Sequence, residues 1–163
     1  PLTYEKEIFK PAAKESYTEM TKANEELITN AYANSLRFTV DDFLHNLVSK
    51  RALDDQIIFY TADHGQTLFH NDDPLTHCHS GDDVPMVEFK VPLMAFSSDI
   101  KNKTKDLGVN KATQEQLFPT TLELMGYGDD ISKVYGPTLS EGVSAETIEV
   151  NVGNTGKRLK YQP

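Results

Sequence analysis

The sequence predicts an α/β fold of packed layers around a mostly parallel or mixed sheet. Apolar residues recur at helical spacing between residues 25 and 50. Two short apolar runs, residues 56–60 and 91–96, lack the alternation of a half-buried strand. Such runs are typical of strands that are covered on both faces. Because so few strands make only a thin sheet, we expect the chain to be part of a larger layered structure.

The first long element is a helix, predicted over residues 25–50. Its apolar side chains share one face and fall three or four residues apart: Leu36, Val40, Phe43, Leu44 and Leu47. Charged side chains take the opposite face: Asp41, Asp42 and Lys50. A stripe of this kind packs one side of a helix on a core and leaves the other side in water.

The C-terminal third begins with a second predicted helix. Residues 113–116 have capping-box spacing, and Gly126 is a natural C-terminal cap. Residues 127–142 are predicted to be a loop. Residues 148–152 alternate like a surface strand, and the polar tail, residues 153–163, is expected to be partly loose.

Charge and composition exclude several classes of protein. The 163 residues contain 16 Lys and Arg against 25 Asp and Glu, a formal net charge of −9. A chain this acidic repels phosphate backbones, so nucleic-acid binding is not expected. A single cysteine, Cys78, excludes an intrachain disulfide and a CxxC zinc site. The sequence starts at Pro1 rather than Met, and no charged-then-apolar stretch follows. We therefore expect an excised piece of a longer protein, and a cleaved start is the alternative.

The most informative segment for chemistry is Asp63-His64-Gly65, directly after the first predicted strand. Ligands of open α/β sheets bind at the carboxyl ends of strands. Asp supplies an oxygen and His a nitrogen, a pair that zinc and often manganese accept, and Gly lets the backbone turn sharply beside them. The alternative is an Asp that caps the loop and a His that makes an ordinary hydrogen bond.

Three more histidines follow in the same loop. His64, His70, His77 and His79 fall within 16 residues, and neutral imidazole is the commonest metal ligand. The pattern favours a metal site that uses part of this set; an exposed polar loop is the alternative. In an extended segment Cys78 points away from His77 and His79, so we do not expect these three residues to form a metal clip by themselves. Nothing nearby except these histidines activates the thiol, so we expect Cys78 to be a small, partly buried residue and not a nucleophile.

Several segments together resemble a known family. They are residues 27–36 and 41–44, residues 59–65, His77, Val84-Pro85, Val91-Pro92-Leu93 and residues 118–126. In kind and spacing they are similar to elements of sulfatases and of the membrane phosphoethanolamine transferases, both of the alkaline phosphatase superfamily. Gln66 stands where that family has Glu, and Cys78 stands where it has Gly.

The resemblance implies that residues 1–163 form a single domain, the C-terminal portion of a layered α/β/α alkaline-phosphatase-like catalytic domain. Asp63 and His64 would ligate a catalytic divalent metal, zinc in the transferases and calcium in many sulfatases. His77 would contact the transferred phosphoryl group or a second metal, and His79 is an additional candidate for that role. The family's nucleophile, a Thr or a Cys-derived formylglycine, has no matching position here.

For function, the resemblance implies a parent enzyme that transfers phosphoethanolamine from a phospholipid donor to an envelope glycolipid or glycan, such as lipopolysaccharide. The parent would act at the periplasmic face of a bacterial inner membrane. The missing N-terminal part of the same protein would be a partner, and the chain alone would be inactive. A sulfatase is the first alternative. A non-catalytic metal- or partner-binding module is the second, motivated by Gln66 and the missing ligands.

Overall fold

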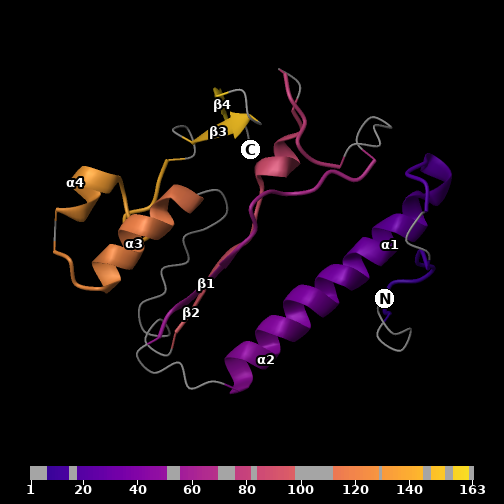
Figure 1. The fold of residues 1–163 in the computed structure, drawn as a ribbon, viewed down its shortest axis with the longest axis horizontal. Coiled ribbons are helices and arrows are strands. Elements are labelled where there is room, and N and C mark those ends of the chain that lie inside the picture. The colour runs from indigo at the N-terminus through magenta and orange to yellow at the C-terminus, as the bar shows by residue number, and fades with distance from the viewer. Residues whose placement is uncertain are drawn as a thin grey trace.

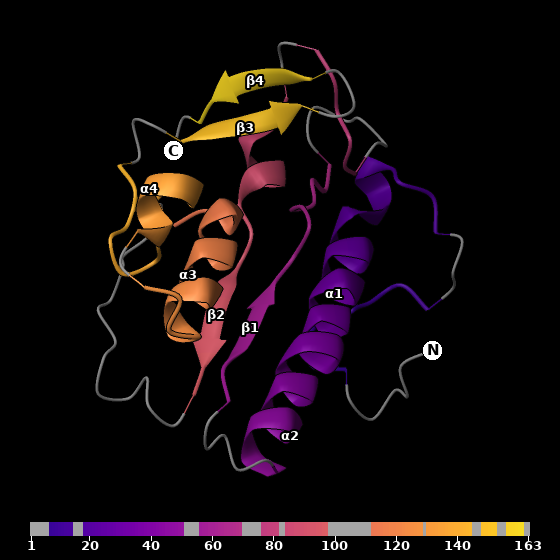
Figure 2. The same cartoon turned by 60° about the vertical axis from the view of Figure 1, so that its left-hand side comes forward.

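A computed structural model describes residues 7–14, 18–50, 56–69, 76–81, 84–97, 112–128, 130–144, 148–152 and 156–161. The helices are α1 (Glu25–Leu36), α2 (Asp42–Lys50), α3 (Leu117–Leu124) and α4 (Ile131–Tyr135), and the strands are β1 (Ile58–Thr61), β2 (Leu93–Phe96), β3 (Glu149–Val152) and β4 (Lys157–Lys160). Figure 1 and Figure 2 show the β1–β2 pair between the α1–α2 rod and the α3–α4 pair. The layered α/β class is therefore confirmed.

The helix predicted over residues 25–50 is confirmed as a single rod (Figure 1). A π-helical turn, Arg37–Asp41, joins α1 to α2. Such a turn carries one extra residue and rotates the apolar stripe. On α2 the stripe is only partly covered, because Leu44 is buried while its neighbour Phe43 is 58% exposed.

The direction of the sheet differs from the sequence prediction. β1 and β2 pair antiparallel, with Ile58 opposite Phe96 and Thr61 opposite Leu93. A parallel pair needs a crossover that returns the chain to the far end of the sheet. Among the described residues between the two strands, the only helix is the short 3₁₀ helix η5 (Met86–Phe89), so the chain re-enters at the edge where it left. β3 and β4 are antiparallel as well.

The start and end of α3 follow the sequence prediction. Thr113 and Gln116 form the capping box, in which the Thr113 N–H donates to Gln116 Oε1 at 2.8 Å. Gly126 ends the helix with φ +82° and donates its N–H to the carbonyl of Glu123. The prediction of a loop over residues 127–142 is wrong in part, because residues 131–135 form α4. A single turn is too short to show a helical period in sequence.

The C-terminal strand pair lies at one end of the layers (Figure 2). The strand predicted at residues 148–152 is confirmed as β3. The expectation of a loose tail is wrong for residues 157–160, which form β4. Packing stabilises the β3–β4 pair, because Val152 at the end of β3 is 1% exposed and Tyr161 directly after β4 is 8% exposed. Residues 153–155 and 162–163 of that tail lie outside the described residues.

Polar side chains share the small buried core with apolar ones. The buried apolar residues are Ala12, Leu44, Val84, Ile131, Val152 and Tyr161, and the buried polar ones are Asn34, Thr67, Glu88, Gln116, Thr120 and Thr138. A buried polar group is costly unless it is hydrogen-bonded. All of these side chains except that of Thr138 bind another segment, and Thr138 binds Ser140 in its own turn. In the part of the chain that the structure describes, no helix has the length and apolar character to cross a membrane.

Candidate functional site

The site begins where β1 ends. Only Ala62 separates the last strand residue, Thr61, from Asp63, His64 and Gly65, so these three residues lie at the carboxyl end of the strand, as the sequence predicted. The side chain of Asp63 is 89% exposed and that of His64 is 43% exposed. The Gln114 side chain, from the capping-box turn before α3, donates to Thr61 Oγ1 and to the carbonyl of Ala62. The end of the strand is therefore tied to α3 while its acidic and imidazole side chains stay open to solvent.

The His64 ring is held in one tautomer. Its Nδ1 lies 2.7 Å from the carbonyl oxygen of Gly65, which can only accept a hydrogen bond. Nδ1 therefore carries the proton, and Nε2 keeps its lone pair. The Nε2 atom lies 3.9 Å from Oδ2 of Asp63, while Oδ1 of the same carboxylate accepts the backbone N–H of His64 at 3.0 Å.

This donor pair has the chemistry of a metal site. Two ligand bonds of about 2.1 Å at a tetrahedral angle place their donor atoms about 3.4 Å apart. The observed 3.9 Å between Asp63 Oδ2 and His64 Nε2 is near that value, so the two residues fit one divalent ion after a small movement. Within the described ranges, no three His, Cys, Asp or Glu side chains are grouped to hold a metal. Further ligands would have to come from elsewhere.

The structure brings His77 to His64. Their rings stack with centroids 4.6 Å apart and planes 12° from parallel, and His77 Nδ1 lies 3.0 Å from Thr76 Oγ1. The loop that carries His77 is thus folded back over the end of β1. His70 also belongs to the predicted histidine cluster, but it lies outside the described residues.

His79 takes a different place from His77. Its side chain is 11% exposed, and its Nδ1 binds Oε1 of Glu88, a carboxylate that is itself 6% exposed. The backbone N–H of His79 also donates to Glu88 Oε2 at 3.3 Å. His77 and His79 therefore face different groups, although one residue separates them.

Gly65 is needed for a reason that the sequence did not predict. Its φ does not lie in the left-handed region. Instead, a Cβ at this position would overlap the carbonyl oxygen of Val87 and lie 3.0 Å from the carbonyl oxygen of Lys90. The Gly65 N–H donates to the carbonyl of Glu88 at 2.7 Å. Close approach to η5, and not a sharp turn, requires glycine here.

Sequence reasoning missed the residues that support the site, chiefly Glu88, Thr67 and Gln114. A signal for Glu88 was present, because it is a lone charge among the apolar residues of the segment Met86-Val87-Glu88-Phe89. A charge in such a context is buried with a partner or lies at a surface break. Thr67 and Gln114 carry no comparable signal.

Cys78 differs from the expectation of a partly buried residue. It is exposed and has φ +64°. The left-handed region is unfavourable for a residue with a Cβ, and it is where glycine is favoured. A glycine at position 78, as in the family that the sequence resembles, would adopt this backbone conformation without strain.

The comparison with protein families matches residues 1–127 to the Sulfatase family. The match covers more than half of the 163 residues and includes the end of β1 with Asp63 and His64, His77, and all of α3. Neither the comparison with curated proteins nor that with solved structures gives a match. Sulfatase-family domains generally bind a divalent metal, which agrees with the donor pair at the end of β1. The chain belongs to the sulfatase family.

Proposed function

We propose that Asp63 and His64 hold a catalytic divalent metal, zinc, in an enzyme that transfers phosphoethanolamine to an envelope glycolipid or glycan. The observation that carries the proposal is the single cluster at the end of β1. There, Asp63 Oδ2 and His64 Nε2 lie 3.9 Å apart and His77 stacks on the His64 ring. When bound, the metal would supply positive charge that polarises the ester and the attacking group.

The roles of the chain's own residues follow from their places. Asp63 and His64 would bind the ion through oxygen and nitrogen, the donor types that zinc accepts. His77, over the His64 ring, would meet the transferred phosphoryl group and stabilise its charge through an imidazole N–H. His79 is less suited to that contact, because its Nδ1 is directed at Glu88. The donor would be a phospholipid, and the reaction would take place at the periplasmic face of the inner membrane.

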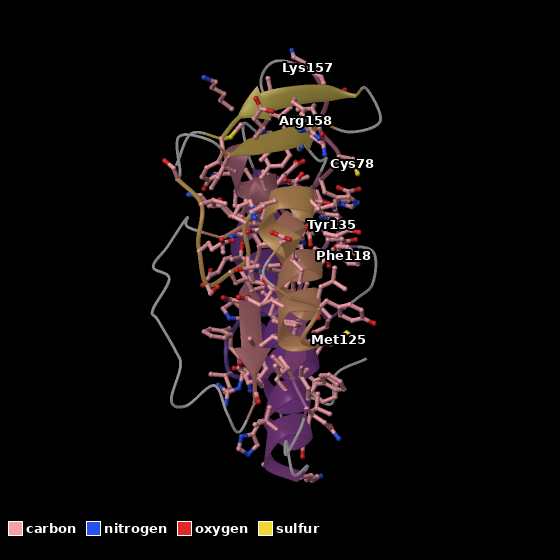
Figure 3. The ribbon with its side chains drawn as sticks, turned by 90° about the vertical axis from the view of Figure 1, so that its left-hand side faces the viewer. Cys78, Phe118, Met125, Tyr135, Lys157 and Arg158 are labelled. Atoms are coloured by element: carbon pink, nitrogen blue, oxygen red, sulfur yellow. The ribbon has the colours of Figure 1, made fainter. Side chains whose placement is uncertain are left out.

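The proposal includes completion of the site by residues outside this sequence, in particular the nucleophile. An exposed apolar surface on α3 and α4 supports it. Phe118 and Tyr135 meet edge to face with centroids 5.1 Å apart, and Figure 3 shows them together with Met125 farther along. These three side chains are 57%, 53% and 65% exposed. Apolar groups gathered in this way mark surfaces that contact other polypeptide.

A second candidate is a sulfatase that hydrolyses a sulfuric ester. The observation that favours it is the family match itself, since the matching description is Sulfatase. In that case calcium would replace zinc, and a formylglycine would replace a threonine nucleophile. The motifs around residues 27–36 and Val84-Pro85 favour the transferase.

The test is a calorimetric zinc titration of the metal-free chain and of three variants, Asp63→Ala, His64→Ala and His77→Ala. Asp63→Ala and His64→Ala are expected to weaken zinc binding by at least about tenfold, because each removes a ligand. The matched controls are Asp41→Ala and His45→Ala, an exposed acid and an exposed imidazole on the α1–α2 rod. Both controls should bind zinc with the affinity of the unmodified chain.

Two results would count against the proposal. Undiminished zinc binding in Asp63→Ala and His64→Ala would place the metal elsewhere. Loss of binding in His77→Ala alone would move the site into the loop and favour a non-catalytic binding module. If the unmodified chain binds no zinc, these two donors are insufficient without ligands from outside this sequence.

A further inference from the structure

Among the described residues, Glu88 is the one acid that is buried. It lies on η5, is 5% exposed, and has the apolar neighbours Val87 and Phe89. A carboxylate in such a place is unfavourable unless hydrogen bonds replace the lost water. The position therefore persists only because neighbouring segments supply donors.

Those donors come from two segments. From the segment after β1, Thr67 Oγ1 donates to Oε1 at 3.1 Å, and the Gly65 N–H donates at 2.7 Å to the backbone carbonyl of Glu88 and not to its carboxylate. The second segment is the loop of residues 76–81, here called the histidine loop, which carries His77 and His79. Its His79 donates to the Glu88 carboxylate through the backbone N–H at 3.3 Å and through Nδ1. One residue thus binds both segments at once.

Each bound segment carries one ring of the stacked pair. Gly65 directly follows His64, and His79 lies two residues after His77. An extended chain spans only about 3.3 Å per residue, so neither ring can move far from the group that Glu88 holds. The Thr67 N–H also donates to the Thr76 carbonyl at 2.7 Å, next to His77, which gives the two segments a direct contact.

We propose that Glu88 is a positioning residue, which sets the stacking of His77 on His64 by joining the two segments that carry them. The inference rests on the proposed metal site for its consequence, namely that zinc affinity depends on Glu88. It also divides the two loop histidines. His77 faces the site, and His79 is the contact through which Glu88 holds the loop.

The experiment uses the whole chain as Glu88→Ala and Glu88→Gln. One readout is the nuclear Overhauser effect between ring protons of His64 and His77 in the zinc-free protein, and the other is zinc affinity by calorimetry. Glu88→Ala is expected to lose the ring contact and to weaken zinc binding by about tenfold. Glu88→Gln keeps one acceptor oxygen, which can take the bonds from Thr67 Oγ1 and His79 Nδ1 that Oε1 accepts, but it loses the acceptor for the His79 backbone N–H. It should therefore restore both readouts in part. Glu19→Gln removes the charge of one exposed acid that lies on neither of these two segments, and it serves as the control.

Retention of the ring contact in Glu88→Ala overturns the proposal, whatever happens to zinc affinity. If Glu88→Ala does not fold, Thr67→Val decides instead. It removes one donor to Glu88, and it should weaken the ring contact and lower zinc affinity by about fivefold. Unchanged readouts in Thr67→Val then overturn the proposal. If the unmodified chain binds no zinc, the two donors are insufficient without ligands from outside this sequence, while the ring-contact readout still decides the role of Glu88.

Discussion

The N-terminal segment beside α1 and the histidine loop at the end of β1 are each held by one buried polar side chain, but the two side chains differ in chemistry. In the first region, buried Asn34 accepts the N–H groups of Ile8 and Phe9 at 3.0 and 3.1 Å and donates to the Phe9 carbonyl at 2.9 Å. In the second, the buried Glu88 carboxylate accepts from Thr67 Oγ1 and from the backbone N–H and Nδ1 of His79. Each side chain fixes a segment that has no regular secondary structure.

The difference lies in what is bound. The Asn34 amide is neutral, and each of its groups is matched by a backbone group that carries no chemistry of its own. Glu88 instead binds an imidazole in the loop that carries His77 and the segment that carries His64. Loss of the Asn34 side chain should lower only the free energy of unfolding. Loss of the Glu88 side chain should lower the free energy of unfolding and also change the proposed metal site.

The largest expected effect is that of Gly65→Ala. The new Cβ would overlap the Val87 carbonyl oxygen, and because this obstacle is backbone, η5 or the end of β1 must shift. We expect a loss of about 3 kcal/mol in the free energy of unfolding, measured in urea, together with weaker zinc binding. Gly126→Ala is the control, since it meets open space and suffers only from its φ of +82°, at about 1 kcal/mol. Equal losses in the two variants would contradict the close-approach argument.

Asn34→Ala comes next and is expected to separate the two regions. It leaves two backbone N–H groups and one carbonyl of residues 8 and 9 without their partner, at a cost of about 2 kcal/mol in the free energy of unfolding. Zinc affinity should not change. Asn30→Ala, which removes one exposed hydrogen bond to the Pro11 carbonyl, is the matched control and should cost about 0.5 kcal/mol. A fall in zinc affinity in Asn34→Ala would show that the regions are coupled.

The smallest effect has the opposite sign. Cys78→Gly relieves a φ of +64°, worth about 1–2 kcal/mol, but adds freedom to the unfolded chain, worth about 0.5–1 kcal/mol. The net expectation is a gain of about 0.5 kcal/mol in urea unfolding. Ser80→Gly in the same loop, where φ is not positive, should destabilise the protein. A loss of stability in Cys78→Gly would mean that its side chain makes a favourable contact.

Local pattern was enough to predict much of the fold. The period of residues 25–50 predicted the α1–α2 rod, and residues 113–116 with Gly126 predicted both ends of the helical segment around α3, because caps and helical faces depend on neighbours in sequence. The end of β1 with Asp63 and His64 was predicted in the same way. By contrast, α4 and β4 were missed, because one turn or one short strand acquires its stability from packing.

The sequence by itself determined the α/β class, the family resemblance and the residue types at the end of β1. Only the tertiary structure decided that the β1–β2 ladder is antiparallel, that His77 and not His79 lies on His64, and that Gly65 is required by close contact with η5. It alone placed Glu88 behind the site. The physical reason is that chemistry and local geometry are carried by single residues and their neighbours. Which segments meet is instead set by buried hydrogen bonds and contacts between residues far apart in the chain.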